Sequence, residues 1–216
     1  MFGELFNNPF AFFSWLMALV IAITIHEFAH AYAADRLGDP TPRVQGRLTL
    51  NPLAHLDPLG TLMLLIARFG WGKPVVFDPF NLRHPRRDAA IISLAGPASN
   101  IALAALLSVM LRTALTTPYA MIAYAFIQPI IILNVFLAVF NLVPVHPLDG
   151  FKIVGGILPK EYAQQWYELE PYGLIFLLFL IFPIFGGVAP VARLIMPVIS
   201  FLLSLLLPGV GAAVVI

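Results

Sequence analysis

Apolar stretches separated by short polar breaks predict a bundle of membrane-spanning helices. The first stretch runs from about Pro9 to Arg36, the second from about Ala89 to Leu111, and the third from about Tyr119 to Leu142. At about 1.5 Å of rise per residue, helices over these stretches cross the roughly 30 Å hydrocarbon core of a bilayer. A further apolar stretch, residues 172–207, is broken by prolines and glycines and predicts two helices or one bent pair.

Residues 39–87 interrupt the apolar pattern between the first two spans. The segment holds a dense group of basic residues: Arg43, Arg47, Arg68, Lys73, Arg83, Arg86 and Arg87. Because basic loops of membrane proteins face the cytoplasm, we expect this segment on that side. Val44–Leu50 and Lys73–Phe77 have the composition of short β-strands, each followed by an Asn-Pro or Asp-Pro pair. Leu59–Phe69 is apolar but too short to span, which favours a re-entrant segment.

Composition places the chain among integral membrane proteins. Of its 216 residues, 60% are hydrophobic and 11% charged, and the mean hydropathy is +0.91. Soluble domains are roughly 45–50% apolar and about 25% charged. We therefore expect an all-α polytopic membrane protein with a three-helix core, one or two C-terminal helices and a small β-strand or re-entrant segment. The length and the N-terminal composition favour a single domain over residues 1–216, without a secretory signal or an appended soluble domain.

An HExxH sequence, His26-Glu27-Phe28-Ala29-His30, lies inside the first span. A carboxylate near the centre of a membrane helix costs roughly 2.5–3.5 kcal/mol, so a functional role is favoured over a chance match. Residues four apart share one face of a helix, and two imidazoles so placed can reach one metal ion. Glu27 follows the first histidine, where a base for metal-activated water is needed.

The chain has no cysteine, so any zinc ion must be held by His, Asp or Glu, the ligands typical of catalytic sites. Such sites generally have a third protein ligand, and Asp149, before Gly150 at the end of the third span, is the best candidate. The first and third spans run in the same direction, so both elements are expected at a similar depth. His146 is an alternative ligand, and a plain Asp-Gly turn is the ordinary alternative for Asp149.

Several segments together resemble the site-2 protease family of intramembrane zinc metalloproteases. They are the HExxH sequence, Asn141-x-x-Pro144-x-x-x-x-Asp149-Gly150, and the segments at 51–60, 81–88 and 95–100, in the order the family has them. The resemblance covers most of residues 20–155 and is to a short form without a PDZ or CBS domain. Family members often have another helix before the HExxH helix, and here fewer than ten residues precede it.

The resemblance implies that His26, His30 and Asp149 bind one zinc ion per chain. It also implies that Glu27 is the catalytic acid/base and that Asn141 holds the substrate carbonyl or its oxyanion. The implied enzyme is a zinc-dependent endopeptidase that cleaves transmembrane helices of membrane-tethered proteins or peptides. We expect it in the cell membrane as a multi-pass protein, with its active site nearer the cytoplasmic side.

Other functions and partners fit the sequence less well. A non-proteolytic metal-binding protein or zinc carrier needs ionisable residues along a crossing path, yet the C-terminal stretch has no acidic residue or histidine. A regulatory relative without catalysis is disfavoured by the intact Glu27. The net charge of +1 leaves no basic face for nucleic acid. A homo-oligomer is compatible with so short a chain.

Three further expectations concern polar groups and substrate. Asn100 and Asn134, within spans, are expected to hydrogen-bond between helices. His55 and His84 are expected to be loop side chains rather than ligands. The two strand-like pieces are expected to pair with an extended substrate by edge addition.

Overall fold

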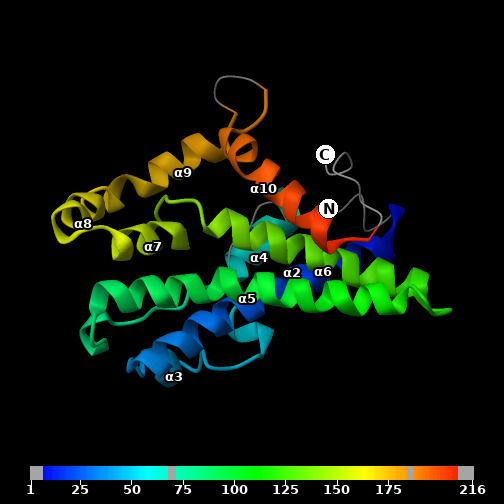
Figure 1. Ribbon diagram of the computed structural model, residues 1–216, viewed down its shortest axis with the longest axis horizontal. Coiled ribbons are helices and arrows are strands. Elements are labelled where there is room, and N and C mark those ends of the chain that lie inside the picture. The colour runs from blue at the N-terminus through cyan, green and yellow to red at the C-terminus, as the bar shows by residue number, and fades with distance from the viewer. Residues whose placement is uncertain (1–6, 68–71, 184–186, 209–216) are drawn as a thin grey trace.

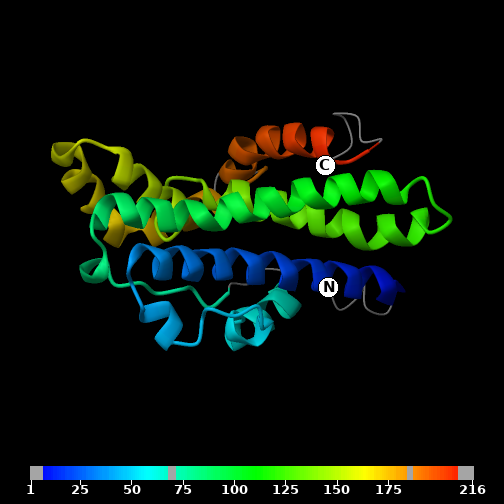
Figure 2. The ribbon, with the colours of Figure 1, turned by 60° about the horizontal axis from the view of Figure 1, so that its bottom comes forward.

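Three long helices form the core of the protein. The computed structural model describes residues 7–67, 72–183 and 187–208. Helices α2 (Pro9–Leu37), α5 (Pro85–Ala114) and α6 (Ala120–Asn141) run alongside one another (Figures 1 and 2). Each is long and apolar enough to cross a membrane, which confirms the three predicted spans. α5 begins at Pro85 rather than at Ala89, because the fixed φ of proline suits the first position of a helix.

Small side chains let α2 pack closely against its neighbours. Ala18, Ala22, Ala31 and Ala34 have no exposed surface, and α2 contacts both α5 and α6. Lipid tails are as apolar as the helices, so close van der Waals contact of this kind is a main source of cohesion in a membrane bundle.

Two buried asparagines join the three core helices. Nδ2 of Asn100 in α5 donates to the Ala22 carbonyl of α2 at 3.0 Å and to Oδ1 of Asn134 in α6 at 2.7 Å. Both asparagine side chains are fully buried. Their predicted role in interhelical hydrogen bonding is confirmed, and these bonds fix how the three helices sit relative to one another.

The segment between α2 and α5 is built from short helical pieces. They are α3 (Thr41–Val44), the 3₁₀ turn η1 (Pro52–Ala54), α4 (Pro58–Ala67) and a second 3₁₀ turn, η2 (Pro79–Asn81). α4 occupies most of the apolar segment expected at Leu59–Phe69, whose residues 68 and 69 lie outside the described ranges. Figure 2 shows α3 and α4 on the outer side of α2.

The two predicted β-strands are wrong. Val44 is the last residue of α3, and residues 45–50 and 73–77 are turns and irregular backbone. Over the described ranges the β pairing consists of one isolated antiparallel bridge, between Leu56 and Gly72. At the first segment, the Arg47 N–H donates to the Pro42 carbonyl and closes a turn. At the second, Pro74 has no N–H, and its carbonyl accepts a hydrogen bond from the Arg47 side chain instead of a neighbouring strand.

Asp39 organises the chain just after α2. Its fully buried carboxylate accepts hydrogen bonds from the backbone and hydroxyl of Thr41, from the Asp78 N–H and from Nδ2 of Asn81. Burial acts to raise the pKa of Asp39, but these hydrogen bonds together hold the pKa below its ordinary value. One carboxylate therefore ties both ends of the loop to the end of α2, where Gly38 turns the chain at φ +111°.

The C-terminal part wraps over the other side of the core. It consists of α7 (Asp149–Ile157), α8 (Lys160–Tyr167), the 3₁₀ turn η3 (Glu170–Tyr172), α9 (Gly173–Ile181) and α10 (Pro190–Leu206). α7 packs against α5, and α10 packs against α6. α9 and α10 lie across the core from α3 (Figure 1), and α10 lies across it from α4 (Figure 2). Of the two arrangements expected for the tail, the described residues show two separate helices.

Candidate metal centre

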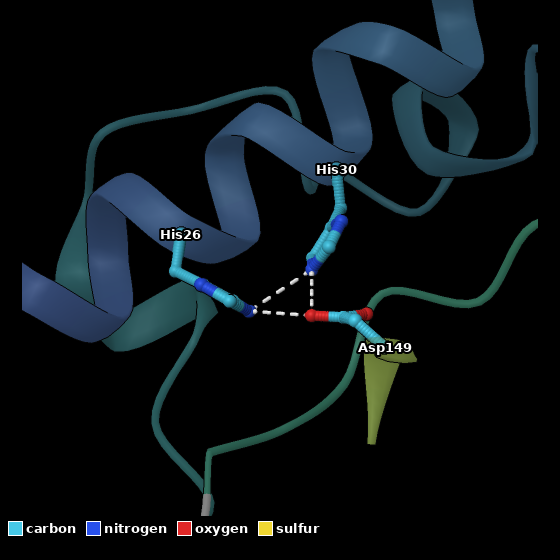
Figure 3. A group of neighbouring side chains, drawn as sticks. All are labelled: His26, His30 and Asp149. Carbon is cyan, nitrogen blue, oxygen red and sulfur yellow. Dashed lines mark hydrogen bonds and ion pairs between the residues drawn. The ribbon is translucent and has the colours of Figure 1, made fainter. Parts of the chain in front are cut away.

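His26 and His30 point from α2 toward Asp149, the first residue of α7 (Figure 3). The Nε2 atoms of the two histidines are 3.0 Å apart. Oδ2 of Asp149 lies 3.1 Å from Nε2 of His26 and 3.2 Å from Nε2 of His30. The histidines are 4% and 8% exposed, so this triangle of donor atoms is largely shielded from the surface.

The other ring nitrogen of each histidine is held by a hydrogen-bond acceptor. Nδ1 of His26 faces Oδ1 of Asn100 at 2.6 Å, and Nδ1 of His30 faces the Ile92 carbonyl at 2.7 Å. The Asn100 amide nitrogen is already donating to two carbonyl oxygens, which fixes its orientation. Each Nδ1 must therefore carry the proton and donate it. In the neutral imidazole, each Nε2 then presents a lone pair.

The donor set fits a metal ion. Two imidazole lone pairs and a carboxylate oxygen converge at 3.0–3.2 Å, and three acceptors at this distance repel one another unless a metal ion or a shared proton lies between them. Ligands about 2.0–2.1 Å from a tetrahedral zinc ion stand about 3.3 Å apart, close to the observed spacing. Metal-bound histidines also typically donate their other N–H to an oxygen, as both do here.

Two glycines allow the elements to approach this closely. A Cβ added to Gly96 of α5 would lie 2.4 Å from Nε2 of His30 and 2.7 Å from Cε1 of His26. A Cβ added to Gly150 would lie 2.3 Å from the Leu142 carbonyl oxygen, at the end of α6. Glycine is thus required at position 150 because the backbone at the end of α6 lies so close to it. Gly150 does not end a helix, because α7 begins at Asp149. The ordinary Asp-Gly turn is not what forms here.

Replacing Gly96 with alanine is expected to weaken zinc binding by about 10–100-fold, the range seen when groups supporting metal ligands are altered. The added methyl group must displace both imidazoles, because its position lies within 2.4–2.7 Å of ring atoms of each. Zinc affinity is measured by competition with a chromophoric chelator. Ala98→Val adds bulk to the same helix at an exposed position and should leave the affinity unchanged. Equal affinities for the Gly96 variant and the wild type would contradict this packing argument.

Glu27 lies beside the histidines and is bonded to the loop that follows α4. Its Oε2 accepts a hydrogen bond from the Val75 N–H at 2.9 Å. Arg47, only 3% exposed, is close enough for its charge to interact with that of Glu27. Burial lowers the pKa of Arg47, and the Glu27 carboxylate acts in the opposite direction. The attraction between the two charges thus favours the charged form of the Arg47 guanidinium.

The other residues weighed for the site make contacts with side chains and backbone outside the ligand triangle. Nδ2 of Asn141, the last residue of α6, donates to the Leu137 carbonyl of its own helix at 2.9 Å. The His146 ring packs edge-on against Phe151, and its Nδ1 faces Glu170 at 3.6 Å. The group of ligand atoms within 4.8 Å of one another contains Asp149 and not His146. His55 is buried in the loop, with Nε2 against the Thr49 carbonyl, as a loop side chain.

Sequence reasoning missed the residues that orient the ligands. Asn100 was assigned only to helix packing, yet it also holds Nδ1 of His26. Gly96 lies in a run of small residues, Ala95 to Ser99, and the sequence analysis did not predict that α5 meets the imidazoles there. A polar residue next to such a run, within a span that faces an HExxH helix, is the signal that could have identified them.

Comparison with known proteins supports the same assignment. The chain is 38% identical over 178 residues to YwhC of Bacillus subtilis, provisionally named a zinc metalloprotease, and the match covers 78% of this chain and 80% of YwhC. The chain belongs to the site-2 protease family. This confirms the resemblance seen in the sequence. Together with the three membrane-length helices, it identifies a membrane protein of the zinc metalloprotease class.

More distant members of the site-2 protease family extend the comparison. Rip2 of Mycobacterium tuberculosis, also provisionally named a zinc metalloprotease, is 35% identical over 167 residues, which are 74% of this chain and 63% of Rip2. Zinc metalloprotease MJ0392 of Methanocaldococcus jannaschii is 22% identical over 160 residues, 74% of this chain and 39% of that protein. No family model and no solved structure matches the chain.

Proposed function

We propose that this protein is an intramembrane zinc metalloprotease that cleaves transmembrane helices of membrane-tethered proteins or peptides. The observation that carries the proposal is the convergence of two imidazole lone pairs and one carboxylate oxygen beside Glu27, within a bundle of membrane-length helices. We propose that the whole chain acts as one catalytic domain in the cell membrane.

In this proposal His26, His30 and Asp149 hold one zinc ion per chain. Two histidines completed by one carboxylate are a typical catalytic set, which keeps a fourth position open. Zinc held by these residues would supply a Lewis acid that lowers the pKa of water toward neutral and polarises the substrate carbonyl. Asn100 and the Ile92 carbonyl keep both imidazoles in the tautomer that presents Nε2 to the site.

Glu27 and Asn141 carry the other proposed roles. Glu27 takes the proton of the attacking water and returns it to the leaving amine. Asn141 donates its side-chain amide to the substrate carbonyl oxygen as negative charge develops there. Nδ2 of Asn141 has two N–H groups, and one of them donates to the Leu137 carbonyl. The second N–H is the one proposed to bind substrate.

Access to the site is proposed from the cytoplasmic side. The histidines lie in the C-terminal half of α2, and Asp149 follows the end of α6, so the site adjoins the basic loop at 39–87. The positive-inside rule assigns that end to the cytoplasm. A helical substrate must unwind to expose its amide, so helix-breaking residues near the cut favour cleavage. Edge pairing with strands at 44–50 and 75–77 is not retained, because neither segment forms a strand.

The proposal is tested with purified protein and a reporter transmembrane substrate in detergent or liposomes. We expect about one zinc ion per chain and a cut inside the membrane segment. Removing the metal with a chelator should abolish cleavage, and adding zinc should restore it, because the metal would supply the acidity that activates the water. If the metal-loaded protein leaves the reporter substrate intact but moves zinc into vesicles, the result would favour the alternative function, a zinc carrier.

A further inference from the structure

A single backbone peptide joins two oppositely charged side chains next to the metal centre. The Val75 N–H donates to Oε2 of Glu27 at 2.9 Å. The Pro74 carbonyl, which belongs to the same peptide unit, accepts from Nη2 of Arg47 at 2.7 Å. The peptide therefore lies between a guanidinium and a carboxylate, and both charges stabilise its dipole. Such a chain of charge-assisted hydrogen bonds is stronger than its neutral counterpart.

Arg47 is fixed in place from two parts of the loop. Besides the Pro74 carbonyl, its guanidinium donates to the carbonyl oxygens of Ala54 and Lys73. The side chain is 3% exposed. A buried cation is costly unless it is paired and hydrogen-bonded. The planar guanidinium of Arg47 is hydrogen-bonded to three backbone carbonyls. The negative charge of Glu27, on the other side of the Pro74–Val75 peptide, compensates its positive charge.

The peptide is also held on its far side. The Phe77 ring packs against the buried cluster of Ala34, Leu82 and Ile92, and Nζ of Lys152 lies 4.6 Å from the centre of that ring. Lys152 belongs to α7, the helix that begins with Asp149. The Pro74–Val75 peptide is thus held by Arg47 on one side and by the packing of Phe77 on the other, and these contacts fix the position of the Val75 N–H relative to Glu27. The Phe77 contact includes Lys152 of α7, the helix that carries the third ligand.

We propose that Arg47 is a positioning residue for the reaction, acting on Glu27 through the Pro74–Val75 peptide. Oε2 of Glu27 is engaged by the Val75 N–H, so the carboxylate is oriented, and in this arrangement Oε1 is the oxygen that takes the proton of the attacking water. Holding a catalytic group within a narrow range of orientations is a recognised source of rate. The inference rests on the proposed function, since it gives Glu27 the role of base.

Arg47→Ala and Val75→Pro test the proposal by removing either end of the bridge. Proline at 75 deletes the N–H that Glu27 accepts, within a segment that is already irregular and follows Pro74. For both variants we expect kcat to fall about 10–100-fold, as for other residues that support a reactive group. KM is expected to stay within about twofold, because the bridge does not define the substrate site. Zinc content should match the wild type, because no ligand is altered.

Two matched variants control for the loop itself. Arg43→Ala removes a second arginine of the same loop, whose salt bridge to Asp35 is on the exposed surface. Val76→Pro places a proline at the exposed neighbouring position. Both are expected to keep kcat within about twofold of the wild type. Wild-type kcat in both Arg47→Ala and Val75→Pro would overturn the positioning role.

Amide hydrogen exchange tests the bridge without any substrate or turnover. The Val75 amide should exchange at least about tenfold faster in Arg47→Ala and in Glu27→Ala than in the wild type, because each removes one partner of the peptide. Arg43→Ala should leave that rate unchanged. Equal exchange in all four proteins would overturn the bridge. A different outcome is faster Val75 exchange in the Arg47 and Glu27 variants together with a zinc-loaded wild type that does not cleave the reporter. That result would refute the proposed function, and the positioning role with it.

Discussion

Glu27→Gln is expected to lower the cleavage rate by about 10²–10⁴-fold, the usual contribution of a positioned acid/base. Glutamine has nearly the same shape and keeps an oxygen that can accept the Val75 N–H, so the surroundings of residue 27 are preserved. It cannot take up the proton of water. Zinc content should not change, since His26, His30 and Asp149 are intact. Single-turnover cleavage of a reporter transmembrane substrate, with metal analysis of the same sample, measures both quantities.

Asp35→Asn is the matched control for this substitution. Asp35 lies on the same helix, α2, and pairs with Arg43 outside the metal centre. Neutralising it should leave cleavage within about twofold, because surface ion pairs contribute little. Cleavage by Glu27→Gln at the wild-type rate would remove Glu27 from the mechanism. Loss of zinc from this variant would show that the carboxylate is needed for the metal rather than for proton transfer.

Asp149→Ala is expected to lose both zinc and activity. Oδ2 of Asp149 stands 3.1–3.2 Å from the two Nε2 atoms, and removing it leaves two ligands where catalytic zinc generally has three. The zinc content of the purified protein should fall from about one ion per chain to a small fraction. Cleavage should fall in proportion to the metal. Metal analysis after dialysis, followed by cleavage with and without added zinc, tests this directly.

His146→Ala discriminates between the two third ligands that the sequence left open. The His146 ring contacts Phe151 and Glu170, so its removal should leave zinc content unchanged. The assignment of Asp149 is refuted if the His146 variant loses the metal while the Asp149 variant retains it. A folding control is needed for both, and retention of the wild-type melting temperature in detergent provides it.

The candidate site was predicted in part from local spacing. His26 and His30 are one helical turn apart, so any helix over this stretch places both imidazoles on one face. Their meeting with Asp149 required a further step, the parallel direction of the first and third spans. The structure brings these three residues together. Spacing and topology carried that expectation without any knowledge of side-chain contacts.

The strand prediction failed because strand-like composition does not show where backbone hydrogen bonds go. Residues 44–50 and 73–77 have suitable composition, but the Arg47 side chain takes the carbonyls of Lys73 and Pro74. A strand needs those groups free for a partner. The same contact creates the link to Glu27, and nothing in the spacing of Arg47, Pro74 and Val75 along the chain indicates it.

The sequence by itself determined the membrane character, the three long helices and the shared face of the histidine pair. Hydropathy and the helical period of 3.6 residues are properties of a local stretch of sequence, so they do not depend on how the rest of the chain folds. Only the tertiary structure decided that Asp149 rather than His146 meets the histidines, that Asn100 orients one of them, and that Gly96 makes room for both. These depend on which atoms from distant segments touch, and close packing rather than pattern selects them.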